Sequence, residues 1–311
     1  MQRSDTDSAT PRDDLCVSVA RRQMLLGAAV AAAGWRTAHA AHDVASLLPR
    51  ARPARVALAL GGGGCRGHGH IGVLRALEKS GLKPDLVVGS SAGSLVGALY
   101  AAGISADELE YYGQRMSPNL LRDWVFPNLG IFGGDRIRRF VAERVGERTI
   151  ESLPVRFAAV ATNLKNGVLV ALDQGDAGLA VQASCSVPGL LEPVRIDGQV
   201  LVDGNLSAPV PVVAARRLGA RHVIAVDVTF PPEQANLGDP FDVLYQAFSI
   251  LTRKLAIEER EVADLVIAPR LPGRNHEMST VTSKALVDAG ERAALEVMPQ
   301  LRALFAPALR N

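Results

Sequence analysis

The sequence GSSAG at residues 89–93 places Ser91 between two glycines, a spacing typical of a nucleophilic serine. Such a serine stands on a sharp turn between a strand and a helix. The residues two before and two after it must be small, because the strand and the helix approach closely there. Gly89 and Gly93 meet this requirement. We therefore predict that Ser91 lies on a nucleophile elbow, with its hydroxyl near the positive end of a helix.

A second glycine-rich motif, LALGGGGCRGHGHIG at residues 58–72, begins in an apolar segment. Successive glycines after a buried strand let backbone N–H groups converge on one point, as stabilisation of an oxyanion requires. The same motif satisfies G-x-G-x-x-G through Gly62, Gly64 and Gly67, which is typical of dinucleotide-binding proteins. That alternative needs an acidic residue at the end of the next strand, where the chain has Ser90. We favour an oxyanion hole.

A serine hydroxyl attacks a carbonyl poorly unless a base accepts its proton. Asp203, in LVDGN, follows a strand beside a glycine, and a carboxylate hydrogen-bonded to a serine can be that base. An ordinary turn aspartate is the other interpretation. His276, in PGRNHEMST, is the alternative base of a Ser-Asp-His hydrolase. His222 opens a strand, so in a parallel sheet it lies at the end opposite Ser91 and is a poor candidate.

Short apolar segments indicate the strands that must position these residues. Several of them are apolar throughout, as is typical of strands that helices cover on both faces. The segments expected to be strands are residues 56–60, 86–88, 155–162, 168–172, 223–228 and 265–268.

Longer stretches between these strands have helical spacing, including residues 70–80 and 92–102, which each end at a glycine. Asp197 and Gly198 form a turn signal typical of a tight hairpin, which places Asp203 just past the returning strand. Together these features predict an α/β protein with three layers, α/β/α, and a largely parallel central sheet.

The composition limits the classes of partner. Lysine and arginine total 34 against 32 aspartate and glutamate, and the net charge of +2 gives no reason to expect nucleic-acid binding. We expect neither a metal nor an organic cofactor, because serine chemistry needs none. With 48% hydrophobic residues and no internal repeat, residues 43–311 are expected to form one domain.

Residues 1–42 have the composition of an export signal. Arg21 and Arg22 precede the apolar run 24–35, and residues 38–40, AHA, fit a small-residue cleavage site. We therefore expect export by the twin-arginine route, with a periplasmic location. The alternatives are an alanine-rich leader with a chance arginine pair, and a protein that is cytoplasmic or associated with the inner membrane.

Five motifs occur together in one order: GGGGCRG, GSSAG, ATNL, ASCSVPGLLEPV and LVDG. Over about residues 55–270 this combination resembles the patatin-like phospholipases, particularly the bacterial branch related to neuropathy target esterase. The resemblance implies a patatin-like fold, hydrolysis of lipid esters through an acyl-enzyme, and a catalytic dyad of Ser91 and Asp203 without a histidine. It also implies an oxyanion hole formed by Gly62, Gly63, Gly64 and Arg66.

One residue departs from the pattern of that family. Asn205 follows Asp203 and Gly204, where the family usually has glycine or alanine. Asparagine tolerates unusual backbone angles, and its amide can hydrogen-bond a neighbouring carboxylate and alter its basicity. A catalytically weak lipid-binding or regulatory protein on the same fold is therefore the alternative function.

The segment 116–134 combines aromatic residues with prolines and glycines, and it is our candidate for a wall that contacts acyl chains. Trp124, Phe126 and Phe132 would line that wall. The expected partners are a lipid or fatty-acyl ester and, at the periphery, a membrane surface. An ordinary packed loop is the competing interpretation.

Overall fold

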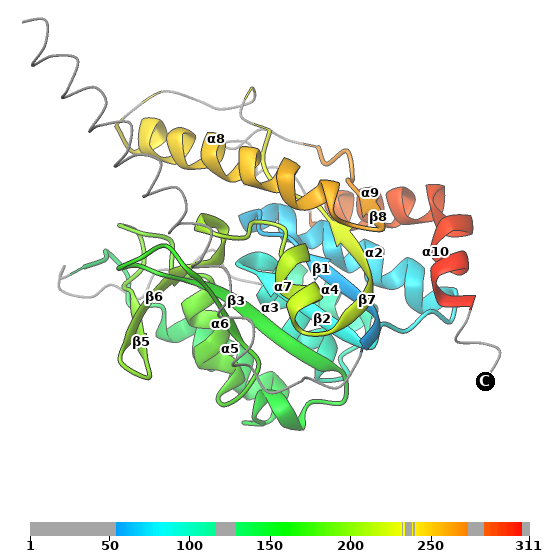
Figure 1. Cartoon of the computed structure of the whole chain (residues 1–311), viewed down its shortest axis with the longest axis horizontal. Coiled ribbons are helices and arrows are strands. Elements are labelled where there is room, and N and C mark those ends of the chain that lie inside the picture. The colour runs from blue at the N-terminus through cyan, green and yellow to red at the C-terminus, as the bar shows by residue number, and fades with distance from the viewer. Residues whose placement is uncertain are drawn as a thin grey trace, which may run out of the picture. The chain divides into compact units, whose positions relative to one another are not determined.

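The structure is a computed structural model that describes residues 54–115, 129–231, 233, 238, 240–272 and 283–306, the side chains of 240 and 241 excepted. These residues belong to one compact unit, Ala51–Asn311. In these ranges eight strands form a single sheet, in the order β5-β6-β3-β2-β1-β7-β8, with β4 paired to β3 (Figure 1). The strands are β1 (Ala54–Leu60), β2 (Leu86–Ser90), β3 (Arg156–Asn163), β4 (Leu169–Leu172), β5 (Val194–Ile196), β6 (Gln199–Asp203), β7 (Ala220–Val226) and β8 (Leu265–Ile267).

The centre of the sheet is parallel and one side is antiparallel. Strand β1 pairs in parallel with β2 and with β7, β2 pairs in parallel with β3, and β7 with β8. Strands β4, β5 and β6 run antiparallel to their neighbours. The predicted largely parallel sheet is therefore confirmed. The strand predicted at residues 223–228 is β7, which begins three residues earlier, at Ala220, and ends at Val226.

Helices cover both faces of the sheet, as the sequence of β1 requires. Val56, Leu58 and Leu60 face one core, which also contains residues of α2, α3, α5, α6 and α9, whereas Ala57 and Ala59 face a second core with α7 and one residue of α8. The helices are α2 (His68–Lys79), α3 (Ala92–Ala101), α4 (Ala106–Arg115), α5 (Asp135–Val145), α6 (Ala177–Ser184), α7 (Val212–Arg217), α8 (Pro240–Glu261), α9 (Ser283–Glu296) and α10 (Met298–Phe305), with short 3-10 helices η2 (Gly64–Gly67), η4 (Ile150–Ser152) and η5 (Gly204–Leu206). The three predicted layers are present.

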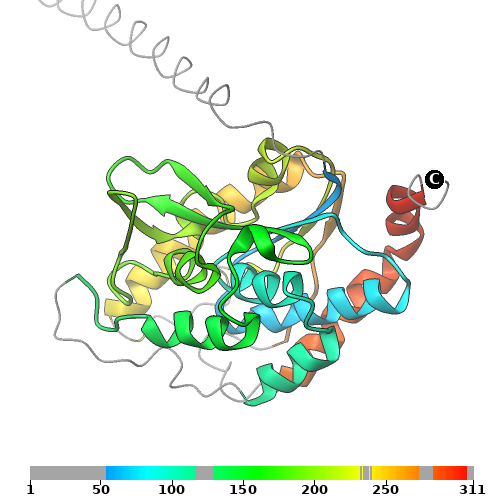
Figure 2. The same ribbon diagram turned by 90° about the horizontal axis from the view of Figure 1, so that it is seen from below.

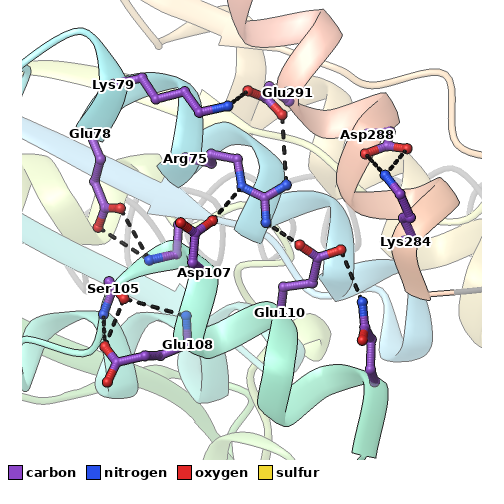
Figure 3. Close-up of polar contacts among 12 residues, drawn as sticks. Arg75, Glu78, Lys79, Ser105, Asp107, Glu108, Glu110, Lys284, Asp288 and Glu291 are labelled. Atoms are coloured by element: carbon purple, nitrogen blue, oxygen red, sulfur yellow. Dashed lines mark hydrogen bonds and ion pairs between the residues drawn. The ribbon is translucent and has the colours of Figure 1, made fainter.

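Helices α2, α4 and α9 pack side by side, and Figure 2 shows them in blue, green and orange. Charged side chains join them at the surface (Figure 3). The side chain of Arg75 is 10% exposed, and its guanidinium forms ion pairs with Asp107 at 3.0 Å, with Glu291 at 3.7 Å and with Glu110. Lys79 forms a further ion pair with Glu291 at 2.7 Å. This network of ion pairs links α2, α4 and α9.

The predicted hairpin joins β5 to β6. Asp197 and Gly198 have φ values of +48° and +74°, and positive φ at both central residues is what a tight two-residue turn of this type needs. The turn leads directly into β6, which ends at Asp203. Within the described residues, no helix combines the length and the apolar content needed to cross a bilayer.

Candidate active site

Ser91 stands on a strained turn between β2 and α3. Its φ of +50° and ψ of −123° lie in a region that residues other than glycine rarely adopt. A Cβ on Gly89 would lie 2.4 Å from the carbonyl oxygen of Gly93, and a Cβ on Gly93 would lie 2.1 Å from that of Leu60. The two glycines are therefore needed for the close approach of strand and helix, as predicted for a nucleophile elbow.

The sheet register brings Ser91 and Asp203 to the same height on either side of β3. Ser90, the last residue of β2, pairs with Val160, and Asp203, the last residue of β6, pairs with Ala161. The Ser91 Oγ donates a hydrogen bond of 2.8 Å to Asp203 Oδ2. The structure thus brings together the two residues that the sequence selected from positions far apart in the chain.

Burial strongly affects Asp203. Its side chain is fully buried, whereas Ser91 keeps 8% of its surface exposed. Burial raises the pKa of Asp203 to about 7, although hydrogen bonds from the Asn205 N–H and the Ser91 hydroxyl act in the opposite direction. A carboxyl group with this pKa can accept and return a proton near neutral pH.

Other serines hold the elbow in place. Ser184 Oγ accepts the N–H of Ser91 at 3.0 Å and donates to the carbonyl of Val160 at 2.6 Å, and Ser94 Oγ donates to the carbonyl of Ser91 at 2.7 Å. The carbonyl of Ser186 accepts the N–H of Asp203 at 2.9 Å. No sequence pattern indicated a role for these residues, although Ser184 and Ser186 belong to the motif ASCSVPGLLEPV.

Two of the four residues predicted for the oxyanion hole have backbone amides that are already hydrogen-bonded. The N–H of Gly62 donates to the carbonyl of Pro209 at 2.9 Å, and the N–H of Arg66 donates to the carbonyl of Gly63 at 3.1 Å. These two amides are already paired by the folding of the loop, so they are not free donors. In the described part of the chain the amides of Gly63 and Gly64 make no such hydrogen bond, and they are the remaining candidates from this loop.

Arg66 has a structural position beside the loop. Its side chain is 5% exposed, donates from Nε to the carbonyl of Val228 at 3.1 Å, and stacks 5.4 Å from the ring centre of Phe230. Burial lowers the pKa of Arg66 to about 10, with Asp227 acting against that shift. Through Nε, Arg66 therefore ties the loop to Val228. Its buried Nη1 has no hydrogen-bond partner within the described residues, and its contribution to the oxyanion hole stays a prediction.

The histidines of the described residues do not contact the Ser91 hydroxyl. His70 is fully buried and its Nε2 lies 2.7 Å from the carbonyl of Gly61, and burial lowers its pKa to about 4. It therefore supports the glycine loop as a neutral ring. His222 pairs with Val56 near the start of β1, at the end of the sheet away from Ser91. His276 lies outside the described residues.

The predicted acyl-chain wall is described only in part. Trp124 and Phe126 lie outside the described residues. Phe132 forms an isolated bridge with Leu191 and packs, half-buried, against the main core. Its role toward a substrate stays a prediction.

Asn205, the residue that departs from the family pattern, connects three parts of the site. Its backbone N–H donates to Asp203 Oδ1 at 2.8 Å, and its side-chain Oδ1 accepts from Ser90 Oγ at 3.2 Å. A Cβ on Gly62 would lie 2.0 Å from that same oxygen, so the carboxamide fills the space beside the glycine loop. The bond to the carboxylate comes from the backbone N–H of Asn205, which any residue except proline would supply.

This arrangement predicts a compensating pair of substitutions. Gly62→Ala is expected to destabilise the protein by about 1–3 kcal/mol, because its methyl group overlaps the Asn205 carboxamide. Asn205→Ala removes one hydrogen bond, a cost of about 1 kcal/mol, and leaves room for that methyl group. In urea unfolding the double variant should therefore be more stable than the sum of the single effects predicts. Additive effects would show that the carboxamide does not occupy this space.

No cluster of three or more histidine, cysteine, aspartate or glutamate side chains suited to a metal ion occurs among the described residues. The groups that the structure brings together at Ser91 are a serine hydroxyl, a carboxyl group and backbone amides, which is a set of groups suited to acyl transfer.

The fold and the elbow define a three-layer α/β protein with a buried serine–carboxyl pair at the carboxyl edge of its sheet. Residues 58–216 match the patatin-like phospholipase family, and the chain belongs to this family. A solved structure of VipD from Legionella pneumophila has a similar fold, with a TM-score of 0.54 and 14% identity, over 81% of this chain and 67% of that one.

Two relatives indicate the branch of the family. The chain is 37% identical over 177 residues to an uncharacterised NTE family protein of Mycobacterium tuberculosis. The aligned region covers 56% of this chain and 49% of the relative. It is 33% identical over 202 residues to lysophospholipase NTE1 of Debaryomyces hansenii, covering 62% of this chain and 13% of the relative. The chain thus spans about half the length of the mycobacterial relative and a small part of the yeast one.

Proposed function

We propose that this protein is a serine hydrolase of lipid esters, a phospholipase, lysophospholipase or esterase, with Ser91 and Asp203 as its catalytic dyad. The observation that carries the proposal is the 2.8 Å hydrogen bond from the Ser91 hydroxyl, on its strained turn, to the buried Asp203 carboxylate. The relation to a yeast lysophospholipase supports a lipid ester as substrate.

The first half of the reaction forms an acyl-enzyme. Ser91 Oγ attacks the ester carbonyl while its proton passes to Asp203, and the carbonyl oxygen becomes an oxyanion. The free amides of Gly63 and Gly64, with the first N–H groups of α3, are the donors that suit this charge. When the ester C–O bond breaks, Asp203 returns the proton to the leaving alcohol.

The second half releases the acid. A water molecule gives a proton to Asp203 as its oxygen attacks the acyl carbonyl, and the bond to Ser91 Oγ breaks. The proton then returns to Ser91, and the fatty acid leaves. The pKa of Asp203, raised to about 7 by burial, suits a group that must gain and lose a proton in every cycle.

A fluorophosphonate probe tests whether Ser91 is an activated nucleophile. The folded protein should be labelled, and Ser91→Ala should remove the label, because only an activated serine hydroxyl attacks the probe. Ser152→Ala is the control and should keep the label, since Ser152 is an exposed serine outside the elbow whose hydroxyl donates to the carbonyl of Thr149 at 2.7 Å. Folded protein that takes up no label would favour the alternative, a lipid-binding or regulatory protein on this fold.

The cellular location of the protein and the residues that contact the acyl chain are part of the same proposal. The twin-arginine signal in residues 1–42 supports export to the periplasm, where phospholipids of both membranes are accessible. Trp124, Phe126 and Phe132 are proposed to contact the acyl chain. Cell fractionation of the full chain, with and without Arg21→Lys and Arg22→Lys, tests the export signal.

A further inference from the structure

Helix α8 is attached to the rest of the protein through polar contacts. The buried carboxylate of Asp227 accepts hydrogen bonds from Arg253 at 2.9 Å and from Arg260 at 3.0 Å, both on α8. Glu259, also on α8, accepts the N–H of Val213 at 2.8 Å at the start of α7. Among the α8 residues whose side chains the structure describes, the buried ones are Ser249, Thr252, Ala256 and Glu259. Its inner face is therefore made of small and polar side chains.

The opposite face of α8 is apolar and exposed. Val243, Leu244, Ile250, Leu251 and Ile257 have 55%, 68%, 50%, 60% and 46% of their surface exposed. They recur at intervals of seven residues, which places them on one side of the helix. We call these five residues the outer stripe of α8. A helix of a globular protein normally turns such a stripe toward the core, so α8 has the reverse arrangement.

The charges around the outer stripe indicate what covers it. Residues 243–252 contain no charged side chain. Arg253 and Arg260, with side chains 32% and 29% exposed, share the single carboxylate of Asp227, so this group carries a net positive charge, and exposed Lys254 adds another. The stripe from Val243 to Leu251 is thus uncharged and is followed by Arg253 and Lys254, before the exposed acidic residues Glu258 and Glu261. An uncharged apolar surface next to cations complements the acyl chains and phosphate groups of a phospholipid layer.

The helix also lies beside the candidate active site. It contacts η5, the turn that immediately follows Asp203. Asp227, which Arg253 and Arg260 of α8 contact, also raises the pKa of Arg66, a residue of the glycine-rich loop, against the larger effect of burial. A membrane that contacted the outer stripe would therefore lie on the side of the protein where the glycine loop and the Asp203 turn are found.

We propose that the outer stripe of α8 is the surface by which this protein binds a phospholipid membrane, with the N-terminal turns of α8 closest to the bilayer. This inference rests on the proposed function, since an enzyme that cleaves membrane lipids must take its substrate from a bilayer. The first turns of α8 enter the interface. The last turn, with exposed Glu258 and Glu261, stays in water.

Vesicle flotation tests the proposal with the full chain carrying Ser91→Ala, so that no lipid is consumed. The vesicles contain phosphatidylcholine and phosphatidylglycerol in a ratio of about 3 to 1, because anionic lipid adds attraction for the cations next to the stripe. Leu244→Glu together with Leu251→Glu should weaken binding about tenfold or more. The matched control, Leu164→Glu with Leu295→Glu, changes leucines that are 49% and 52% exposed on other parts of the surface, and should bind as the parent does.

Several results would overturn the proposal. The outer stripe is not the membrane surface if the parent chain does not float with vesicles, or if the α8 variant floats as well as the control. Light scattering that shows a dimer in solution, dissociated by the α8 substitutions, would assign the stripe to a second copy of this chain instead.

Hydrolysis of the water-soluble ester p-nitrophenyl butyrate separates this proposal from the proposed function. In chains that keep Ser91, the α8 variant should cleave this ester at the rate of the parent. A parent that cleaves no ester but loses vesicle binding through the α8 substitutions would refute the hydrolase and support the membrane surface.

Discussion

Asp203→Asn is expected to lower ester turnover by roughly 10²–10⁴-fold, because an amide cannot accept the proton of Ser91. The replacement has the same shape, and its oxygen can still accept the N–H of Asn205 that Asp203 Oδ1 accepts at 2.8 Å. The fold should therefore be retained. Initial rates on a short-chain ester, with protein integrity followed by circular dichroism, measure the effect.

His276→Ala is the control for this experiment and should leave turnover nearly unchanged. The reverse pattern, in which His276→Ala is inactive and Asp203→Asn retains most of its rate, would replace the dyad by a Ser-Asp-His arrangement.

The same carboxyl group should govern the dependence of activity on pH. The base must be ionised, and burial raises the pKa of Asp203 to about 7, so kcat/KM should fall as pH decreases below about 7 and level off above it. Stability should move in the opposite direction. Because the folded pKa is raised above the unfolded value, Asp203 lowers the free energy of unfolding as pH rises from about 4 toward 7. Asp203→Asn should lose this decrease, which urea midpoints at pH 5 and pH 8 can measure.

Gly93→Ala is expected to have the largest effect on stability. The added methyl carbon would lie 2.1 Å from the carbonyl oxygen of Leu60 and 2.7 Å from that of Gly61, and both are backbone atoms that cannot move aside by changing rotamer. We expect a loss of roughly 3–5 kcal/mol, visible as a fall in Tm of about 10 °C or more, with loss of the elbow geometry and of turnover.

Gly97→Ala is the matched control, one turn along the same helix. Its added carbon would lie 2.9 Å from a methyl group of Val87, a side chain that can adjust. In addition, alanine favours a helix over glycine by about 1 kcal/mol, so a small change in either direction is expected. Equal effects of the two substitutions would show that the approach of α3 to β1 does not constrain the elbow.

Much of this site could be predicted because its requirements are local. A strained serine with small residues on both sides, and a carboxylate just after a hairpin, leave a signal in a few neighbouring positions, as residues 89–93 and Asp203 do. The element order followed from apolar segments for the same reason. The contact between Ser91 and Asp203 depends on strand order, and the resemblance to a known family supplied what spacing alone left open.

Other features were missed because they depend on contacts that are distant in sequence. The N–H of Gly62 is paired by Pro209, far along the chain, so no pattern within the glycine loop shows that this donor is occupied. The hydrogen bond from the Ser91 N–H to Ser184 Oγ likewise joins residues that are distant in the sequence. The orientation of α8 is hidden for the same reason, because its sequence does not show that Asp227 and α7 hold its polar side inward.

The position of β3 between β2 and β6 has a consequence for the reacting distance. Two adjacent strands are about 4.8 Å apart, so the backbones that carry the nucleophile and the base are separated by roughly twice that spacing. Both side chains must therefore lean across the end of β3 to meet. Strand β3 contributes no reacting atom, yet its width sets the distance between the backbones that carry the nucleophile and the base.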